Sequence, residues 1–267
     1  MTRQTRPLAL VTGASSGIGR ALAGEFVRGG FDLLIAAEDT GIADAAQELE
    51  REGGGGVTAV RVDLAAYDGV EELHNALKAL ARPLDALAVN AGVGVSGEFA
   101  DNDLAAELKL VNLNVTSAVH LTRVLLPGMI ERGAGRVLFT SSIAATSPGP
   151  YHATYAASKA FLLSFAEAIR YELRESGVTV TALMPGPTET DFFDRAGMAN
   201  TKLGAMENKD DPADVARQGF EALMAGRDHV VAGSLKNKAQ TAAAKLLPET
   251  TRAKAQARMT EPGSADD

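Results

Sequence analysis

The sequence predicts an α/β protein in which a doubly wound parallel sheet of about seven strands carries helices on both faces. Short and almost continuously apolar runs alternate along the chain with longer stretches whose apolar residues recur at helical spacing. Strands buried on both faces lose the apolar–polar alternation of half-exposed strands, and parallel strands need crossover connections. Right-handed crossovers then place helices on both sides of one sheet.

Each predicted strand is an apolar run that ends at a small, polar or turn-forming residue. The first run, LALVT, stops at Gly13, and the run VTAVRV ends just before Asp63. The predicted strands are Leu8–Thr12, Asp32–Ala37, Val57–Val62, Leu84–Asn90, Gly135–Ser141, Val178–Pro185 and His229–Gly233.

The predicted helices occupy the intervals between these strands. Gly29 and Gly30 are a stop signal for the first helix, and Gly53–Gly56 is interpreted as a flexible turn after the second. Asp211 is the expected N-cap of the last helix, with Pro212 at its first position. The predicted helical segments are Arg20–Gly30, Ile42–Glu52, Tyr67–Ala81, about Asp103–Arg132 with Pro127 disturbing it, Thr154–Gly177 and Asp211–Gly226.

The chain shows no internal repeat and no linker, so residues 1–250 are expected to form a single domain. Residues 188–209 are polar, punctuated by glycine and without a clear period, which predicts a substrate lid. Residues 251–267 are charged and rich in small side chains, which predicts a disordered tail.

Composition excludes several classes of protein. Lys plus Arg number 26 and Asp plus Glu 34, so the net charge of −8 argues against a nucleic-acid partner. No apolar run reaches the roughly 18 residues of a membrane span, and the first apolar run is too short for a signal peptide. The absence of cysteine excludes disulfides and thiolate chemistry. A cytoplasmic protein is expected.

Gly13, Gly17 and Gly19 follow the first strand with the spacing GxxxGxG and open the first helix. Glycines in such a turn let the backbone approach a pyrophosphate, and the helix N-terminus supplies free N–H groups. The position of the loop therefore predicts a Rossmann-type dinucleotide site. A tight turn without a ligand is the alternative.

The end of the second strand is where such a site reads the adenosine ribose. An acidic residue accepts a hydrogen bond from the 2′-OH, whereas arginine accommodates a 2′-phosphate. Glu38 and Asp39 stand there, and either carboxylate would repel a 2′-phosphate. A solvated acidic loop is the alternative. The expected cofactor is NAD(H) or NADP(H), with a lean towards NAD(H).

Tyr155 and Lys159 lie four residues apart in a predicted helix and therefore share a face. A neighbouring ammonium lowers the pKa of a phenol, whose ordinary value of about 10 is too high for a base near neutral pH. Tyr151 has Tyr155, not a lysine, four residues after it. Because a Tyr-x-x-x-Lys pair also arises by coincidence in helices, the spacing alone leaves its role open.

Small, polar or turn residues end five of the predicted strands. Ser142 follows the fifth strand and precedes Tyr155 by 13 residues. The glycine loop, Asp63, Asn90–Gly92 and Pro185-Gly186 end the others. Ligands of α/β sheets bind outside the carboxyl ends of the strands, so these residues are expected at one edge of the sheet.

Together these segments resemble the short-chain dehydrogenase/reductase family, in its single-domain form with the motifs TGxxxGxG and YxxxK. The resemblance covers roughly residues 7–235, and the combination of motifs is specific although each motif alone is weak. The matching segments are TGASSGIG (Thr12–Gly19), DL (Asp63-Leu64), NAG (Asn90–Gly92), LNVT (Leu113–Thr116), SS (Ser141-Ser142), YAASK (Tyr155–Lys159) and PGPTET (Pro185–Thr190).

The resemblance implies roles for three catalytic residues. Tyr155 would be the general acid in carbonyl reduction and the base in alcohol oxidation. Lys159 would lower the pKa of Tyr155 and hydrogen-bond the nicotinamide ribose, and Ser142 would hydrogen-bond the substrate oxygen. The cofactor would supply the hydride chemistry, and the protein the orientation and the proton.

The family spacing also chooses between neighbouring residues. It favours Ser142 over Ser141, because the family serine commonly lies 13 residues before the tyrosine. It favours Asn114 over Asn112, because the family asparagine usually lies 24 residues after the position of Asn90. Asn114 would hold a water in the proton relay.

Cofactor contacts follow from the same resemblance. Asp63 would meet the adenine, Asn90–Gly92 the adenosine ribose side, and Pro185–Thr190 the nicotinamide. The expected cofactor-binding residues are Gly13, Ser15, Ser16, Gly17, Ile18, Gly19, Glu38, Asp63, Leu64, Asn90, Ala91, Gly92, Tyr155, Lys159, Pro185, Gly186, Thr188 and Thr190.

This sequence departs from the family at the end of the second strand. Members that prefer NADP often carry arginine near Glu38 or Asp39, and members that prefer NAD often carry aspartate where Ala37 stands. Val89 also replaces a second asparagine that many members have. The choice between the two cofactors therefore stays open.

The remaining tyrosine and histidines receive other interpretations. Tyr151 either lines the substrate entrance or packs, and the loop residue His152 is either solvated or in contact with substrate. His74, His120 and His229 lie on separate predicted elements without a ligand pattern, so no metal site is expected.

The predicted function is hydride transfer between NAD(P)(H) and a carbonyl/secondary alcohol pair, with a Tyr-Lys-Ser-Asn proton relay. The alternatives are a dinucleotide-binding sensor or scaffold without catalysis, and a 3-oxoacyl-carrier-protein reductase, which the net charge of −8 disfavours. The resemblance implies a homodimer or homotetramer formed through the helices around Asn114 and Tyr155. The lid suggests a moderately apolar small-molecule substrate through Phe192, Phe193, Met198, Leu203 and Met206.

Overall fold

The computed structural model describes residues 6–53, 55–234 and 248–266, and it contains a seven-stranded sheet in the order β3-β2-β1-β4-β5-β6-β7. All six pairings are parallel, which confirms the predicted doubly wound α/β fold. The strand order reverses between β1 and β4, the position at which such sheets bind ligands. The strands are β1 (Leu8–Thr12), β2 (Asp32–Ala37), β3 (Val57–Arg61), β4 (Ala86–Val89), β5 (Gly135–Thr140), β6 (Val178–Pro185) and β7 (His229–Ala232).

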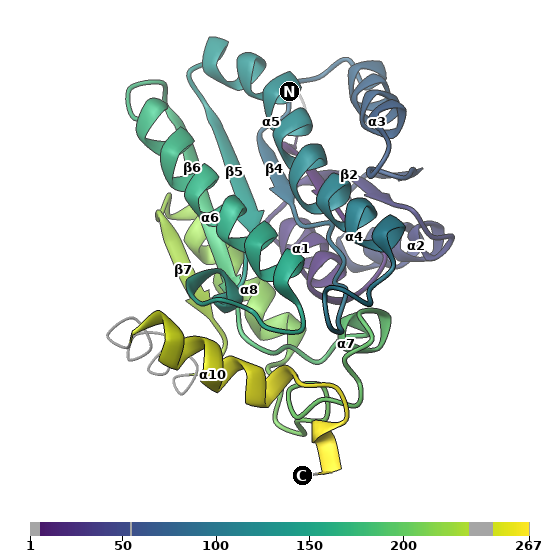
Figure 1. The fold of residues 1–267 in the computed structure, drawn as a ribbon. Coiled ribbons are helices and arrows are strands. Elements are labelled where there is room, and N and C mark those ends of the chain that lie inside the picture. Colours follow the sequence, from purple (N-terminus) through teal and green to yellow (C-terminus); the bar gives the residue numbers. More distant parts are fainter. Residues whose placement is uncertain (1–5, 54, 235–247, 267) are drawn as a thin grey trace.

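The strands are apolar throughout because alternate residues serve two different cores. In β1, Leu8 and Leu10 face one core, whereas Ala9 and Val11 face the other. One core is completed by helices α1 (Gly17–Arg28), α2 (Gly41–Gly53) and α8 (Pro212–Met224). The other is completed by α3 (Tyr67–Ala79), α5 (Ser117–Glu131) and α6 (Ala153–Glu172), and Figure 1 shows α5 and α6 in front of the sheet with α1 and α8 behind it.

The predicted helix at about Asp103–Arg132 is continuous but changes its winding. Helix α4 (Leu104–Val111) passes through a π-helical turn at Asn112–Thr116 into α5. Pro127 lies inside α5 without ending it. Such π turns are frequent at functional sites, and this one contains Asn114.

Two element boundaries follow local chemistry that the sequence shows directly. Asp211 caps α8 by accepting a hydrogen bond from the N–H of Ala213, 2.8 Å away, and Pro212 is the first residue of that helix. Most other boundaries lie within two residues of those expected, whereas α1 begins three residues before Arg20 and α6 ends five residues before Gly177. Strand β3 ends at Arg61, and α2 extends into the first glycine of the tract expected to form a turn.

The predicted lid, residues 188–209, is a loop whose two ends are tied together. The N–H of Glu189 donates to the carbonyl of Asp210 at 2.9 Å, and the N–H of Asp210 donates to the carbonyl of Pro187 at 2.8 Å. Within the loop lies a single short helix, α7 (Phe192–Arg195). The lid is therefore anchored at its base on the end of β6.

The prediction of a disordered tail at 251–267 does not hold for the described residues of that segment. Helix α10 (Glu249–Thr260) is followed by a short 3-10 turn, Ser264–Asp266. The N–H of Leu203 in the lid donates to the carbonyl of Met259 at 2.9 Å, and the hydroxyl of Thr260 donates to the carbonyl of Pro150. Charged and small residues favour solvent in general, but these long-range contacts hold the helix against the lid.

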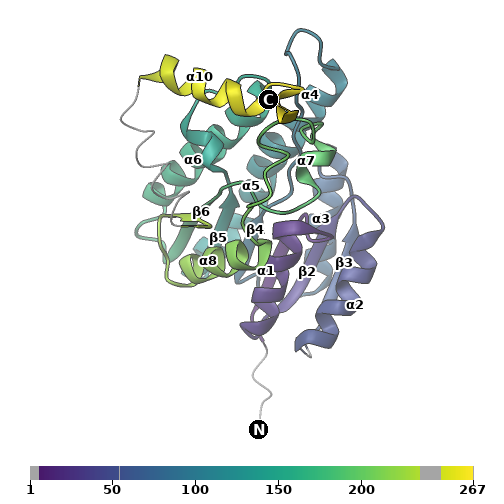
Figure 2. The ribbon, with the colours of Figure 1, turned by 90° about the horizontal axis from the view of Figure 1, so that it is seen from below.

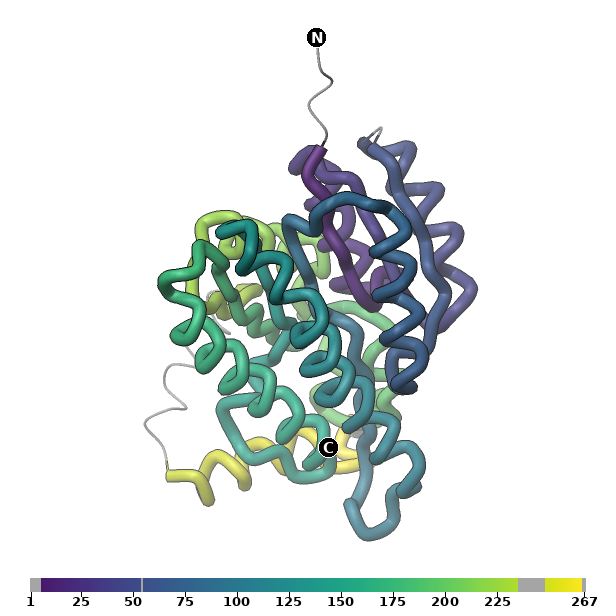
Figure 3. Tube along the Cα trace, turned by 90° about the horizontal axis from the view of Figure 1, so that it is seen from above, coloured from purple at the N-terminus to yellow at the C-terminus, as the bar shows by residue number. Residues whose placement is uncertain are grey.

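Figures 2 and 3 show where this last helix lies relative to the rest of the fold. In Figure 2, α10 lies across α6 on the side of the molecule where α7 lies. In Figure 3, the purple first strand and the yellow α10 occupy opposite sides of the molecule. Among the helices of the described ranges, none has the length and apolar character that crossing a membrane requires.

Candidate active site

A cleft of about 390 Å³ opens at the carboxyl ends of the strands. Every residue expected to bind cofactor or take part in catalysis lines it, with the exception of Asn114. These residues come from loops after β1, β2, β3, β4, β5 and β6 and from the first turns of α6. The topology of the sheet therefore brings together the segments that the sequence singled out separately.

The glycine loop is closely packed against the end of β4. Gly13 and Gly17 have φ values of +68° and +55°, which favour glycine. A Cβ on Gly13 would lie 2.8 Å from the Cα of Ala91, and one on Gly17 would lie 3.1 Å from Cγ2 of Thr190. These glycines line the cleft at the N-terminus of α1, where the lack of side chains lets a pyrophosphate approach the free N–H groups.

Gly19→Ala is expected to weaken NAD(P)H binding about tenfold, because overpacking of this kind costs on the order of 1–3 kcal/mol. A Cβ at this position would lie 2.0 Å from the carbonyl oxygen of Gly13 and 2.5 Å from Nδ2 of Asn90, so the loop must shift. Calorimetric titration with NADH and NADPH measures the loss. Gly24→Ala in the same helix is the control, because its Cβ would meet only the flexible ends of Arg28 and Glu52. Wild-type affinity in Gly19→Ala would contradict the cradle.

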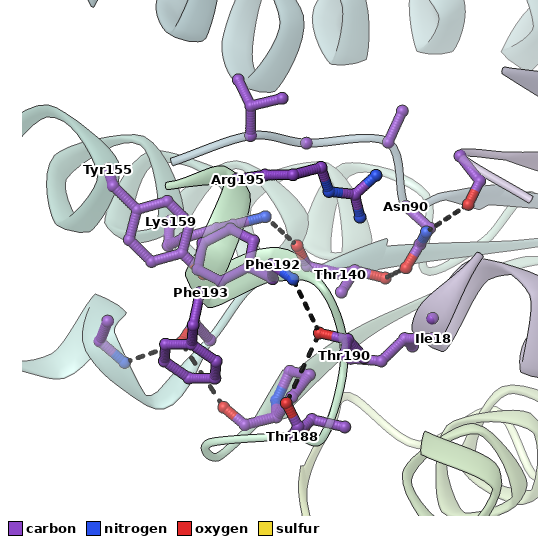
Figure 4. A pocket seen from close by; sticks show the side chains of 18 of the residues that line it. Ile18, Asn90, Thr140, Tyr155, Lys159, Thr188, Thr190, Phe192, Phe193 and Arg195 are labelled. Carbon is purple, nitrogen blue, oxygen red and sulfur yellow. Dashed lines mark hydrogen bonds between the residues drawn. The ribbon is translucent and has the colours of Figure 1, made fainter. Parts of the chain in front are cut away.

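Tyr155 and Lys159 occupy successive turns of α6 at the cleft. The Nζ of Lys159 lies 5.6 Å from the centre of the Tyr155 ring and donates to the carbonyl of Thr140 at 2.8 Å. Figure 4 shows both side chains beside this strand end. The lysine is buried, so a carbonyl at the end of β5 fixes its position.

The two serines after β5 have different tasks. Ser141 donates through its hydroxyl to the carbonyl of Lys159 at 2.7 Å and so holds α6 against the sheet. Ser142 lines the cleft and hydrogen-bonds the phenol of Tyr155. Its hydroxyl oxygen also accepts from the N–H of Ala144 at 3.1 Å, which orients it. Both serines line the cleft, but the hydroxyl of Ser141 is committed to the backbone of α6, and the substrate contact expected of Ser142 stays a prediction.

Burial dominates the acid–base properties of the pair. It raises the pKa of Tyr155 to about 12, and the hydrogen bond from Ser142 counteracts this only in part. It lowers the pKa of Lys159 to about 8. Burial is the larger influence on the phenol in the protein alone, and the lowering of its pKa by Lys159 stays a prediction. The phenol holds its proton across the physiological range.

Asn114 lies behind the cleft and is almost completely buried. Its Oδ1 accepts from the N–H of Val93 at 2.9 Å, and its Nδ2 donates to the carbonyl of Val93 and to the hydroxyl of Ser158, both at 3.0 Å. Asn112 is exposed on the same π turn. Asn114 thus fixes the loop after β4, and its Oδ1 keeps one free lone pair towards Gly92.

The acidic residues after β2 are not free in the structure. Lys109 of α4 donates to both carboxylate oxygens of Glu38, at 2.8 and 3.0 Å. Asp39 accepts from the hydroxyl of Ser15 at 2.6 Å and from the N–H of Gly41 at 2.9 Å. The hydrogen bond from Lys109 neutralises Glu38 and raises the pKa of Lys109 itself. The repulsion of a 2′-phosphate expected from Glu38 is correspondingly weakened.

The structure distinguishes between the alternatives left open for Tyr151 and His152. The Tyr151 hydroxyl donates to Glu261 at 3.5 Å, and the residue is absent from the lining of the cleft. His152, interpreted from the sequence as a loop residue that is often solvated, is 3% exposed and lines the cleft. Its ring centre lies 6.1 Å from that of Tyr155, and burial lowers its pKa to about 4. A neutral imidazole therefore faces the substrate side.

The substrate side of the cleft is largely apolar. The Phe192 ring centre lies 5.1 Å from that of Tyr155, so an aromatic wall adjoins the phenol. Figure 4 shows Phe192 and Phe193 reaching in from the lid beside Tyr155. The lid contributes all five residues expected to suggest an apolar ligand, Phe192, Phe193, Met198, Leu203 and Met206.

The residues of the site that are missing from the sequence-based set include four that lie in no motif. Gln256 and Met259 come from α10, Arg195 from the lid, and Lys109 from α4. The residue patterns gave no signal for Gln256 or Met259, because their segment was expected to be disordered. Lys109 lies 71 residues from Glu38, and no motif joins them. No sequence signal pointed to Arg195 either, because the lid was expected to lack a regular period and contains two further cations, Lys202 and Lys209.

The geometry agrees with what comparison with known proteins shows. The family model described as short chain dehydrogenase matches residues 7–200. A short chain dehydrogenase of Pseudocercospora fijiensis is 37% identical over 187 residues, which cover 69% of this chain and 60% of the relative. The aligned part of the chain thus spans less than two thirds of that relative's length.

Solved structures show the same likeness. A short-chain dehydrogenase of Sphingobium yanoikuyae in complex with NADPH is 28% identical, with a TM-score of 0.78 over 84% of this chain and 87% of that one. A 3-ketoacyl-(acyl-carrier-protein) reductase of Brucella melitensis complexed with NADH is 26% identical, with a TM-score of 0.74 over 85% and 97%. A family match across most of the chain, with these likenesses in fold and sequence, shows that the protein belongs to the short-chain dehydrogenase/reductase family.

Proposed function

We propose that this protein is an oxidoreductase that transfers hydride between NAD(P)(H) and a carbonyl/secondary alcohol pair. The observation that carries the proposal is the meeting of Ser142, Tyr155 and Lys159 in the same cleft as the glycine cradle. The cradle fits a dinucleotide, because Gly13, Gly17 and Gly19 line the cleft without side chains and no acidic residue occupies the first turn of α1. The bound cofactor would supply the hydride chemistry.

The protein's own residues supply the proton and the orientation. Tyr155, which burial keeps protonated, is the general acid for carbonyl reduction. Ser142 hydrogen-bonds the phenol and lines the cleft, so its hydroxyl can hold the substrate oxygen beside the acid. Lys159 is held by Thr140 and provides the ammonium that steadies a developing phenolate.

A relay from Lys159 towards Asn114 completes the proposal. A Cβ built on Gly92 would lie 3.3 Å from Nζ of Lys159 and 3.1 Å from Oδ1 of Asn114, so both atoms border one small space. A water there would accept from the lysine and donate to the free lone pair of the asparagine. The proton that Tyr155 gives to substrate would be replaced along this path.

The walls of the cleft favour a moderately apolar substrate. Aromatic and sulfur-containing side chains from the lid and α10 surround the space next to Tyr155, and His152 and Gln256 add neutral hydrogen-bonding groups. We infer a carbonyl compound that carries apolar bulk and few charges. The alternative substrate, a 3-oxoacyl group on a carrier protein, shares this chemistry. Because one similar solved structure is a reductase of that kind, such substrates belong in the test.

A panel of ketones, aldehydes and secondary alcohols, assayed in parallel with NADH and NADPH, tests the function. Change in nicotinamide absorbance with any of them supports the oxidoreductase. Cofactor binding without turnover across the panel would favour a sensor. Turnover confined to 3-oxoacyl groups on a carrier protein would favour the carrier-protein reductase.

Cofactor preference depends on the pair of Glu38 and Lys109. We expect Glu38→Gln to shift the ratio of kcat/KM for NADH over NADPH about tenfold towards NADPH, because Lys109 is then free to meet a 2′-phosphate. Lys109→Ala is expected to shift the ratio towards NADH, because it exposes the carboxylate. The pair is about half exposed, so neither change is expected to unfold the protein. Equal ratios in wild type, Glu38→Gln and Lys109→Ala would mean that the 2′-position of the cofactor does not lie beside this pair.

Apolar side chains on three helices support a homo-oligomer. Leu108 and Val111 on α4, Val119 on α5 and Phe161 on α6 are exposed. Exposed apolar groups gathered on adjacent helices are typical of subunit contacts. We infer that these helices pair between copies of the chain, which light scattering of the purified protein measures.

A further inference from the structure

The lid sends one cation across the cleft to the glycine loop. Arg195, the last residue of α7, donates through its guanidinium to the hydroxyl of Ser16 at 3.4 Å. The two residues are 179 positions apart in the chain. Figure 4 shows the guanidinium pointing into the cleft between the side of Tyr155 and Lys159 and the side of Asn90.

Ser16 marks the place where an anion is favoured. It is the N-cap of α1, its side chain does not cap the helix, and no acidic residue occupies the first turn. Free N–H groups and the positive end of the helix dipole are therefore left for a ligand. Asp39 accepts from Ser15 and not from these N–H groups.

Arg195 is available for such a ligand. Of the residues that line the cleft, only Arg195 and Lys159 are basic, and Lys159 is buried against Thr140. Within the described parts of the chain, Arg195 has no carboxylate partner, although Asp191 and Asp194 are its neighbours in α7. A guanidinium that is not committed to a carboxylate and lies at a helix N-terminus is suited to bidentate hydrogen bonds with phosphate oxygens.

We propose that Arg195 binds the diphosphate bridge of the nicotinamide cofactor and thereby fastens the lid over the bound dinucleotide. This inference rests on the proposed function and extends it to a residue outside the motifs. Phe192 and Phe193 belong to the same short helix and form the substrate wall. The contact with the diphosphate would therefore also fix the position of that wall.

Titration of the purified full chain with ADP and with adenosine tests the contact, since only ADP carries a diphosphate. We expect Arg195→Ala to weaken ADP, NADH and NADPH about tenfold and to leave adenosine unchanged. Arg195→Lys is expected to recover part of the loss, because a point charge replaces the bidentate fork. Arg217→Ala is the control of equal charge, because Arg217 lies on α8 and pairs with Asp214 and Glu221.

The possible outcomes distinguish a failure of the role of Arg195 from a failure of the proposed oxidoreductase function. Equal ADP affinity in wild type, Arg195→Ala and Arg217→Ala overturns the role of Arg195 and leaves the oxidoreductase proposal standing. A wild type that binds neither NADH nor NADPH overturns both. Hydrogen exchange of residues 188–209 gives a second reading: ADP is expected to protect this lid in wild type and not in Arg195→Ala, and equal protection in both overturns the fastening of the lid.

Discussion

Tyr155→Phe is expected to lower kcat for carbonyl reduction about 10²–10⁴-fold, the usual contribution of a positioned general acid. The substitution removes only the hydroxyl group, and the ring keeps its contacts with Phe192 at 5.1 Å and with the Lys159 ammonium at 5.6 Å. The fold and the cofactor cradle therefore remain. Turnover with the best substrate of the panel gives kcat, and NADH and NADPH titration shows that binding is retained.

Tyr151→Phe is the matched control, four residues earlier in the chain. Its hydroxyl points to Glu261 outside the cleft, so we expect wild-type turnover. Turnover surviving in Tyr155→Phe would remove Tyr155 as the acid. Ser142→Ala supplies a second reading, because loss of its hydrogen bond to the phenol is expected to lower kcat while Tyr155 is intact.

Much of this fold could be predicted because its local chemistry is repetitive. Each strand of β1, β2, β5 and β6 is buried on both faces, so its composition alone marks it. Strand β3 is predicted by its pattern although it is more exposed, because it lies at the edge of the sheet. Topology then places all strand ends at one edge, which is why residues far apart in sequence could be assigned to one cleft.

What sequence could not show depends on contacts between distant segments. The choice of Ser142 over Ser141 rested on spacing, and its physical basis is the bond from Ser141 to the carbonyl of Lys159. The neutralisation of Glu38 needs Lys109, and the order of α10 needs the lid and the carbonyl of Pro150. The charge pattern alone predicted that Glu38 repels a 2′-phosphate and that the C-terminal tail is disordered. Both predictions missed a contact partner that lies far away in the sequence.

Lys159→Met is expected to remove a rise in stability that the wild type shows between pH 8 and pH 10. The side chain is 4% exposed, and burial lowers its pKa from 10.5 to about 8. Between these values the unfolded chain holds a proton that the folded chain has released, so stability increases with pH. At 1.36 kcal/mol per unit the gain over two pH units is about 2–3 kcal/mol.

The gain has an upper limit set by Tyr155. Its pKa is 10.0 in the unfolded chain and about 12 in the fold, so above pH 10 the unfolded phenol ionises first and stability falls again. In the cofactor-free wild type the two contributions are therefore expected to add to a maximum near pH 10, whereas the difference from Lys159→Met levels off there, because both proteins contain Tyr155. The difference between the two denaturant-unfolding curves, measured from pH 7 to pH 11, isolates the titration of Lys159, because Tyr155 is present in both proteins.

The variant Lys109→Met tests whether the rise in stability comes from the burial of Lys159. Lys109 is half exposed and its pKa is raised by Glu38, so it stays charged in both states up to pH 10. The Lys109→Met variant retains Lys159 and is therefore expected to keep the rise. Parallel curves for wild type and Lys159→Met would mean that Lys159 is not held in a buried, weakly hydrated site. Suppose that the rise is lost only in Lys159→Met and that the same variant loses turnover. Lys159 would then be kept for chemistry at the expense of stability, because burying its charge costs free energy that an uncharged methionine does not.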